Sequence, residues 1–293
     1  MSFALEADEP VEGAVRRVAR EQLEKALDEA KSPVIADAVH DLRKRAKKVR
    51  ALLRLVRKAA PELYARENAR VRDAQGLLSS FRDAAALVET FDELLAEPFG
   101  AALDDARLKG LRKALAHRRD DLHAQMHADG RLKEARERLA RVREDVVRWR
   151  VPAAGPDAWV GGLRKTYKRA RKRGAEAEEA PSVERLHEWR KRVKYHRYHC
   201  KLLRRRAPEL IGARRSVAKA LSGLLGDDHD LAVFVRVVAR EELGDPTLRA
   251  VLRDVAAGER RRIQEEAFAL GERLFVEAPD DFVERIRALP LAA

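Results

Sequence analysis

The chain has 293 residues, of which 45% are hydrophobic and 38% charged, and it carries a net charge of +13. This composition supports one large domain or two smaller ones with a real hydrophobic core, and it excludes a disordered basic tail. A single cysteine excludes an intrachain disulfide and a cysteine-based zinc site, which fits a reducing cytosol. The start lacks the regions of a signal peptide, and no stretch approaches about eighteen uninterrupted apolar residues, so we expect a soluble, cytoplasmic protein without a membrane partner.

The first half predicts helices only. Ala, Leu, Arg and Glu are abundant, aromatic residues make up 5%, and no stretch reads convincingly as a strand. Ser32-Pro33 should begin the second helix, with the serine as cap and the proline in the first helical position. Pro61 should end or bend that helix. After a segment through Gly76, the remaining helices of this half should begin near residues 80, 98 and 131. The predicted helices of the first half cover residues 11–30, 33–59, 80–96, 98–129 and 131–149.

The second predicted helix carries a basic row and an apolar row. Both rows step by three and four residues, so each lies on one face of the helix. An apolar row allows a helix to pack onto a core, whereas a basic row is usually a solvated face. The basic row is His40, Arg43, Lys47, Arg50 and Arg54; the apolar row is Leu42, Ala46, Val49, Leu53 and Val56.

A connector is expected at residues 151–157, because two prolines and a glycine are unfavourable in helix interiors. It divides the chain into predicted bundles at 1–150 and 151–293. A helix over 157–177 should follow, and it contains a run of seven basic residues without an acid. Ser182 should begin the next helix and Pro208 should end it. Further breaks are expected near Gly226, Gly244-Asp-Pro246, Gly271 and Pro279.

The second half repeats the two rows of the first. An offset of 147 residues aligns residues 40–63 with 187–210 without a gap, and 12 of the 24 positions are identical. Asp83 falls on Asp230 at the same offset. Such a length is stronger than a short motif match, so we expect two similar helical bundles, related by a pseudo-two-fold axis that brings the basic rows face to face. The second basic row is His187, Arg190, Lys194, Arg197 and Lys201; the second apolar row is Trp189, Val193, His196, Cys200 and Leu203.

The positive charge is concentrated in the two repeated stretches. Residues 40–58 contain nine Lys or Arg and one acid, and residues 185–206 contain ten and one. These stretches carry +8 and +9, so the rest of the chain sums to −4. Solubilising faces usually mix both signs, because like charges on neighbouring turns repel. The concentration therefore indicates an anionic partner.

The repeated motif resembles the CHAD family, an α-helical domain named for its conserved histidines. The resemblance rests on His-x-x-Arg-Lys-Arg-x-Lys-x-x-Arg at 40–50 and 187–197, on Leu-Gly-Asp-Asp-His-Asp at 225–230, and on the Leu-x-x-x-Arg-Asp that ends at Asp83. It implies an all-α fold of paired bundles around a basic central cavity or pore that binds inorganic polyphosphate. It also implies that some members associate with polyphosphate granules. One departure is Ser79, where the second copy has Gly226, and this affects the turn more than the binding face.

The candidate site follows from that resemblance and from phosphate chemistry. Guanidinium groups meet phosphate oxygens with paired, charge-assisted hydrogen bonds, and binding to a polyanion weakens steeply with salt. His40 and His187 contact phosphate or bond a neighbouring helix, and both interpretations stay open. Asp83 and Asp230 are expected to be structural, bonding basic groups inside each bundle. The candidate polyphosphate-binding residues are His40, Arg43, Lys44, Lys47, Lys48, Arg50, Arg54, His187, Arg190, Lys191, Lys194, Arg197, Lys201, Arg17, Arg164, Lys168 and Arg171.

Other titratable residues carry weaker patterns. The stretch Asp227-Asp228-His229-Asp230 has metal-ligating residue types, but after Gly226 we interpret its acids as helix caps. His123 and His127 have the spacing of metal ligands but lack the accompanying acid. Tyr167, Tyr195 and Tyr198 are interpreted as packing groups rather than base-stacking platforms. We therefore expect no metal and no cofactor.

The leading hypothesis is a non-catalytic polyphosphate-binding protein. A nucleic-acid-binding protein is the first alternative, since the isoelectric point is about 10.0, but no reader motif is present. An accessory domain of a phosphate-handling or triphosphate-handling enzyme is the second, because CHAD domains are often joined to a tunnel-shaped triphosphatase. The Glu-x-Glu-x-Lys motif of that partner and the phosphate-cradling Gly-x-x-x-x-Gly-Lys loop are both missing from the sequence.

Overall fold

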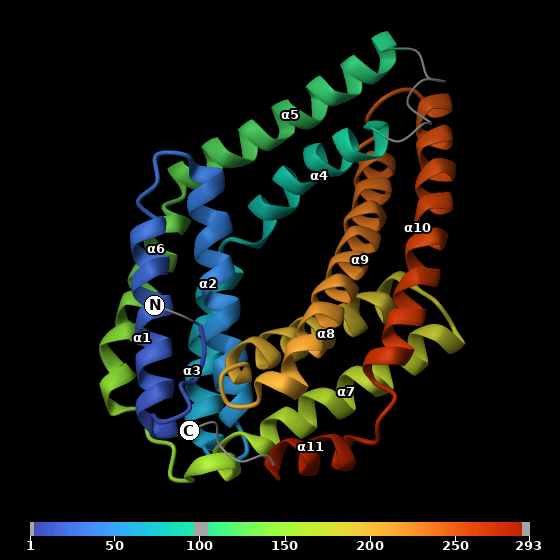
Figure 1. The fold of residues 1–293 in the computed structure, drawn as a ribbon. Helices are drawn as coiled ribbons and strands as arrows, with labels where there is room; N and C mark the ends of the chain where they lie inside the picture. Colours follow the sequence, from blue (N-terminus) through green and yellow to red (C-terminus); the bar gives the residue numbers. More distant parts are fainter. Residues whose placement is uncertain (1–2, 97–104, 289–293) are drawn as a thin grey trace.

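The computed structural model describes residues 3–96 and 105–288, with a few side chains in those ranges excepted. In this part of the chain the protein is all-α, with eleven α-helices and no strand (Figure 1). Of the helices described there, none is long and apolar enough to cross a membrane. The helices are α1 (Val11–Glu29), α2 (Ile35–Val56), α3 (Pro61–Gly76), α4 (Ser79–Ala96), α5 (Asp105–Ala128), α6 (Arg131–Asp145), α7 (Val160–Glu179), α8 (Val183–Leu203), α9 (Pro208–Arg240), α10 (Pro246–Leu274) and α11 (Pro279–Arg287).

Several helix starts follow from proline and serine. Pro61 and Pro208 take the first turn of α3 and α9, where a residue without an N–H costs nothing. Ser182 caps α8, because its Oγ accepts a hydrogen bond from the Arg185 amide at 3.2 Å. The prediction that Ser32-Pro33 begins the second helix is wrong. Ser32 Oγ accepts from the Val34 amide at 3.2 Å, which forms a local turn, and α2 begins only at Ile35. The predicted start of the helix after Pro98 lies outside the described residues.

The breaks predicted at two glycines are also wrong. α9 runs unbroken through Gly226, and α10 runs unbroken through Gly271. A helical glycine costs about 1 kcal/mol against alanine, but packing reverses the preference at Gly271. A Cβ there would lie 2.6 Å from Cζ2 of Trp189, so only glycine lets this indole rest on the helix. Because Asp227 to Asp230 lie inside α9, the capping role predicted for these acids is wrong as well.

The helices form two groups joined where α2 contacts α7 and α8 (Figure 1). α1, α2, α3 and α6 pack around one another, and so do α7, α8, α9 and α10, with α11 against α7. α4 and α5 extend away from the first group, and α4 packs against α9 of the second. Consequently α2, α4, α8 and α9 frame the middle of the molecule.

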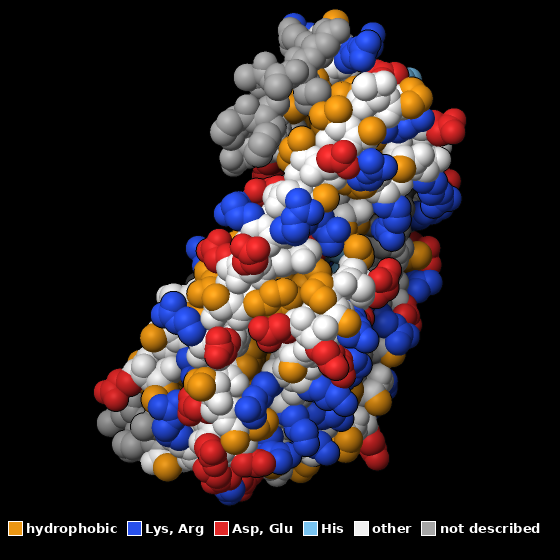
Figure 2. All heavy atoms as spheres, turned by 90° about the vertical axis from the view of Figure 1, so that its right-hand side faces the viewer, with side chains coloured by type: hydrophobic (Ala, Val, Ile, Leu, Met, Phe, Trp, Pro, Cys, Tyr) orange, Lys and Arg blue, Asp and Glu red, His pale blue; other side chains and the backbone are white. Residues whose placement is uncertain are grey.

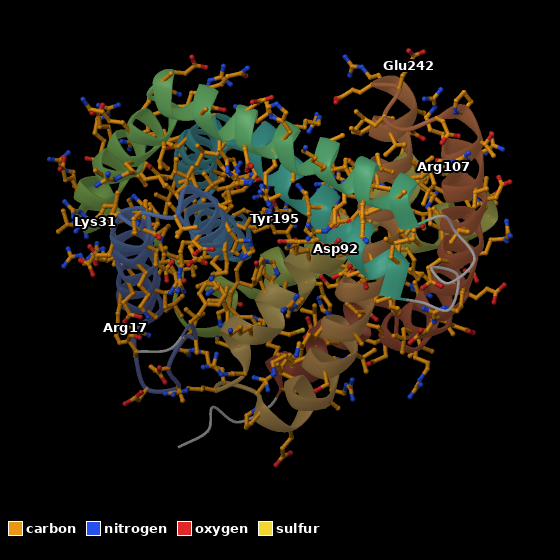
Figure 3. The ribbon with its side chains drawn as sticks, turned by 90° about the horizontal axis from the view of Figure 1, so that it is seen from above. Arg17, Lys31, Asp92, Arg107, Tyr195 and Glu242 are labelled. Carbon is orange, nitrogen blue, oxygen red and sulfur yellow. The ribbon has the colours of Figure 1, made fainter. Side chains whose placement is uncertain are left out.

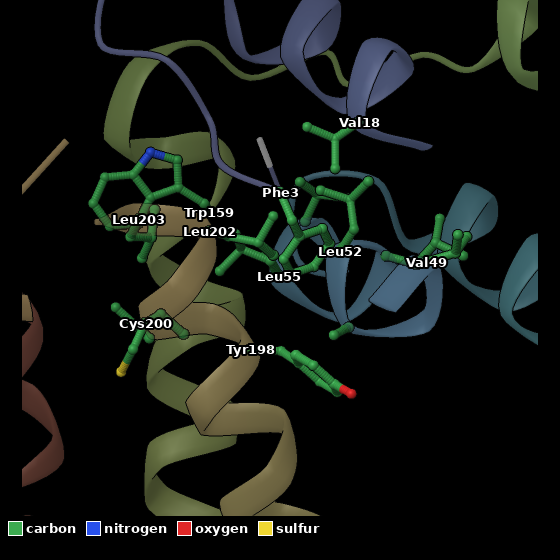
Figure 4. Close-up of a cluster of buried hydrophobic side chains, with 14 of the residues drawn as sticks. Phe3, Val18, Val49, Leu52, Leu55, Trp159, Tyr198, Cys200, Leu202 and Leu203 are labelled. Atoms are coloured by element: carbon green, nitrogen blue, oxygen red, sulfur yellow. The ribbon is translucent and has the colours of Figure 1, made fainter. Parts of the chain in front are cut away.

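Two hydrophobic clusters fix this frame. The larger one crosses between the groups, where Leu52 of α2, Leu202 of α8 and the N-terminal Phe3 pack together (Figure 4). The smaller one joins α4 and α5 to α9 and α10, and it includes the rings of Phe91 and Phe234, 6.0 Å apart. Burying one such side chain contributes about 1.5–3 kcal/mol, so both contacts of the frame are held firmly.

The apolar rows predicted for the two basic helices are confirmed as buried faces. Every member of the α2 row, from Leu42 to Val56, is fully buried. The α8 row, from Trp189 to Leu203, is buried in the same way. Each basic row lies beside its apolar row and therefore faces away from the core, toward the middle of the frame.

Candidate functional site

A cavity of about 790 Å³ lies between α2 and α8 and is bordered by residues of α3, α4 and α9. Its walls carry ten Lys or Arg side chains and a single acid, Asp230. The outer face on the side of α10 looks different, since acidic and basic side chains are interspersed there (Figure 2). The lining residues are His40, Arg43, Lys44, Lys47, Arg50, Arg54, Gln75, Ala86, His187, Arg190, Lys191, Arg192, Lys194, Tyr195, Arg197, Tyr198, His229 and Asp230.

The two repeated rows contribute equivalent residues to this cavity. Five positions of α2 line it together with the five positions of α8 that follow 147 residues later. Arg54 lines it as well, whereas its counterpart Lys201 does not. The equivalent pairs are His40 and His187, Arg43 and Arg190, Lys44 and Lys191, Lys47 and Lys194, and Arg50 and Arg197.

Two cavity-lining arginines of α2, Arg50 and Arg54, are held by neutral oxygens. Arg50 donates to Oδ1 of Asn68 and to Oε1 of Gln75, each at 3.3 Å. Arg54 donates to Oδ1 of Asn68 at 2.6 Å, and its guanidinium lies 4.1 Å from the ring centre of Tyr195. Burial lowers the pKa of Arg54 from its ordinary value. These contacts orient the guanidinium groups without neutralising their charge.

On α8 one acid serves two cations. Glu188 accepts from Lys191 at 2.6 Å and from Arg192 at 2.9 Å. The helix itself is fixed by Trp189, which stacks on Phe268 with 5.5 Å between ring centres and rests on Gly271. Because both helices are anchored by buried side chains, the cations are presented from a rigid support.

Two histidines form a pair in the wall. Nδ1 of His187 on α8 lies 3.1 Å from Nδ1 of His229 on α9, and the ring centres are 4.2 Å apart. Burial, followed by the charges of Lys191 and Arg190, lowers the pKa of His187 to about 4. Burial and then Arg190 lower the pKa of His229 to about 3. The pair is therefore neutral at pH 7, while His40, on the opposite wall, is exposed.

The structure places the other sequence-predicted residues away from the cavity walls. Arg17 of α1 pairs with Glu9 at 2.7 Å and lies at the edge of the molecule, whereas Tyr195 lies near its middle (Figure 3). Lys48 lies over the ring of Phe3, with 5.5 Å from Nζ to the ring centre. Arg164 pairs with Asp280 of α11. Lys168 and Arg171 are exposed on α7, and like Lys201 they do not line the cavity.

The two predicted structural acids have different outcomes. Asp230 of α9 lines the cavity and is half-buried. Asp83 belongs to α4, but its side chain lies outside the described residues. Within the described ranges, no group of three or more His, Cys, Asp or Glu is placed to hold a metal ion.

Six lining residues were not assigned to the site from the sequence, namely Gln75, Ala86, Arg192, Tyr195, Tyr198 and His229. Arg192, Tyr195 and Tyr198 do not belong to the basic row with its three-and-four spacing. They reach the cavity because a wider part of the helix surface lines it on α8 than on α2. Arg192 belongs to the repeated Arg-Lys-Arg motif, which was the available indication. His229 comes from a helix that only the packing of α9 on α8 brings to the site.

Comparisons with known proteins agree with this architecture. A family model described as the CHAD domain matches residues 16–239. The crystal structure of the CHAD domain from the plant Ricinus communis superposes with a TM-score of 0.61, covering 99% of this chain and 96% of that chain at 18% sequence identity. At that identity the likeness shows a shared fold. A comparison with curated protein sequences finds no match.

Proposed function

Because the chain belongs to the CHAD domain family, we propose that it binds inorganic polyphosphate, without catalysing a reaction, in the cavity between α2 and α8. One observation carries the proposal. Equivalent positions of the two helices line a single cavity whose walls contain ten cations and one acid. Polyphosphate is a flexible chain with about one negative charge per phosphate, so many of its units can meet this wall at once.

The state of the cations supports the proposal. Arg50 and Arg54 are oriented by the side-chain oxygens of Asn68 and Gln75, which leave their positive charge in place. Guanidinium groups held in this way bind phosphate oxygens without first losing a carboxylate partner. Bringing so many like charges together costs free energy in the empty protein, and a bound polyanion offsets that cost.

We further infer that the halves 1–150 and 151–293 arose by duplication and are related by a pseudo-two-fold axis through the cavity. The helix bounds support this inference. α1, α2, α3 and α6 begin between 147 and 149 residues before α7, α8, α9 and α11, respectively. Such a duplication supplies the same cations to both walls, which suits a polymer with repeated phosphate units.

Nucleic acid is the competing ligand, and the site favours it less. The two tyrosines of the wall are already engaged, Tyr195 with Arg54 and Tyr198 edge-on with Phe3 at 6.0 Å. They are therefore poor platforms for stacking bases. The cations also line a cavity rather than an open surface along which a duplex can lie. We place the protein in the cytoplasm, on polyphosphate granules where these form.

The test is a pair of titrations at near-physiological salt, one with long-chain polyphosphate and one with duplex DNA. We expect polyphosphate to bind more tightly, by at least about tenfold, because the cations are arranged for backbone phosphates that can enter the cavity. Equal affinity for the two polyanions would overturn the proposal. Labelled protein in cells with and without polyphosphate would then report whether it collects on granules.

A further inference from the structure

The His187–His229 pair occupies a place in the cavity wall where a cation would serve an anionic ligand better. Both residues line the cavity, and they come from different helices. Their Nδ1 atoms are 3.1 Å apart, which is a hydrogen-bond distance. When both rings are neutral, this hydrogen bond requires one Nδ1 to carry its proton and the other to accept. His187 lies one turn before Arg190 on the cavity side of α8.

The chemistry of such a pair depends on one proton. In the neutral pair one ring donates from Nδ1 and the other accepts, which leaves one Nε2–H donor and one bare Nε2 lone pair. Adding a proton keeps the shared hydrogen bond and converts that lone pair into a second donor. Phosphate oxygens only accept hydrogen bonds, so they repel the lone pair and attract the added donor.

Cations dominate the surroundings of the pair in the empty protein. Arg190 and Lys191 on α8 and Arg236 on α9 disfavour the imidazolium form, and Glu188 opposes them. Asp227 and Asp230 on α9, Glu93 on α4 and Glu259 on α10 form an acidic group beside Arg190. Loss of hydration, then Glu93 and Asp230, raises the pKa of Asp227 to about 6. A bound polyanion would neutralise these three cations, so that the charges around the pair would then favour its protonated form.

The repeat indicates what the second position of the pair requires. At the offset of 147 residues His187 corresponds to His40, and His229 corresponds to Arg82. The first copy therefore has a permanent cation in the sequence at the position where the second copy has a histidine. A histidine that becomes protonated on binding reproduces that charge only when ligand is present.

We propose that His187 and His229 together form a proton-coupled phosphate contact, in which polyphosphate binding draws one proton into the pair and the two Nε2–H groups then donate to phosphate oxygens. This inference rests on the proposed function and adds to it a phosphate contact made by a histidine pair rather than by Lys or Arg. His229 becomes a ligand-contacting residue, and the affinity of the site depends on pH.

The direction of that dependence follows from linkage. The free protein has the pair unprotonated above about pH 4, whereas bound phosphate raises the pKa of the pair. Binding therefore takes up protons at any pH between the two values, and affinity increases as the pH falls through the pKa of the bound state. Asp227 also gains a proton near pH 6, so its contribution must be separated.

Isothermal titration calorimetry measures the proton directly. Long-chain polyphosphate, whose internal phosphates do not titrate near neutrality, is added to the full chain at pH 6.5 in two buffers of different ionisation enthalpy. For the wild type we expect uptake of up to about one proton per protein. We also expect the dissociation constant to increase by as much as about tenfold per pH unit as the pH rises through the pKa of the bound pair.

Four variants make the result specific. The double variant His187→Gln/His229→Gln should still bind through the remaining cations but lose the uptake. His229→Arg, which copies the first half, should bind at pH 8 with the affinity that the wild type has at pH 6. Asp227→Asn should keep the uptake, and His117→Gln on α5, far from the site in sequence and exposed, should match the wild type.

The outcomes separate the two levels of the proposal. If the wild type binds polyphosphate and the double variant takes up as many protons as the wild type, the histidine contact is wrong while the proposed function stands. The same conclusion follows if uptake disappears in Asp227→Asn. If the wild type binds no polyphosphate at either pH, the proposed function fails and the histidine contact fails with it.

Discussion

Gly162 of α7 packs against the backbone of α2 at Arg54 and Leu55, where the basic row of α2 ends. A Cβ at this position would lie 1.8 Å from the carbonyl oxygen of Leu55 and 2.6 Å from that of Arg54. The carbonyl oxygen of Gly162 accepts a hydrogen bond from Nη2 of Arg57 at 3.3 Å. The missing side chain of one glycine thus sets how closely α7 approaches the helix that carries Arg54 to the cavity.

Gly162→Ala should destabilise the protein by more than the 1–3 kcal/mol that is usual for overpacking, because the obstacle is backbone rather than a movable side chain. Chemical denaturation monitored by circular dichroism measures the change. Gly212→Ala is the matched control, since nothing lies within 4 Å of its added Cβ. There the loss of glycine from α9 should stabilise the protein by about 0.5–1 kcal/mol. Equal effects of the two substitutions would show that the contact at Gly162 is not close.

At the scale of the helix, α2 and α8 each combine an apolar row and a basic row. Like charges one turn apart cost a few tenths of a kcal/mol per pair, whereas each buried apolar side chain contributes about 1.5–3 kcal/mol. The free energy gained by burying the apolar rows beside the cations therefore exceeds the free energy of repulsion between the cations. This surplus lets the protein keep closely spaced cations on a helix that still packs firmly.

Charge reversal on these helices should remove binding without removing the fold. The variant Arg43→Glu/Arg50→Glu/Arg190→Glu/Arg197→Glu takes two cations from each wall, and we expect affinity for polyphosphate to fall at least about a hundredfold, since each charge-assisted contact contributes about 1.5–3 kcal/mol. Titration calorimetry measures affinity, and circular dichroism checks that helix content is retained.

The matched control reverses four exposed cations elsewhere, with the same change in net charge: Arg131, Lys133, Arg141 and Arg148. These lie on α6 and the turn after it, and none of them lines the cavity. Their reversal should change the affinity only slightly. A loss as large as that of the α2 and α8 variant would mean that total charge, and not the cavity, determines binding.

At the scale of the whole molecule, much of the positive charge is gathered around one cavity. Ten cations surround one cavity, while the outer face near α10 mixes both signs (Figure 2). Mobile ions screen charges over about 10 Å at 0.1 M salt, so added salt weakens both the repulsion inside the empty cavity and its attraction for a polyanion. Stability and affinity should therefore respond to salt in opposite directions.

Raising sodium chloride from about 50 to about 200 mM should increase the Tm of the free protein and weaken polyphosphate binding at least about tenfold. Differential scanning fluorimetry and calorimetric titration across the same salt series measure the two effects. In the fourfold variant of α2 and α8 the Tm should rise less, because four of the ten repelling cations have been replaced by acids. An equal rise in both proteins would assign the effect to charges outside the cavity.

The sequence by itself determined the all-α class, the two rows on each basic helix, the repeat and the family, but not every helix: residues 61–76 form α3, for which no helix was predicted. These features are local or repeat at a fixed offset, so the spacing of Leu42 to Val56 suffices to predict a buried face that the structure confirms. The family membership predicted from the repeated motif is confirmed by the match over residues 16–239.

Only the tertiary structure decided which charged side chains meet. Arg17 and Arg164 look equivalent to the cavity cations in the sequence, yet acids outside the cavity, Glu9 and Asp280, hold them elsewhere. α9 passes through Gly226 and brings His229 to His187 because packing against α8 outweighs the local preference of glycine. The contacts of Arg164 and His229 join residues far apart in the chain, and their free energy depends on how whole helices pack rather than on any spacing within them.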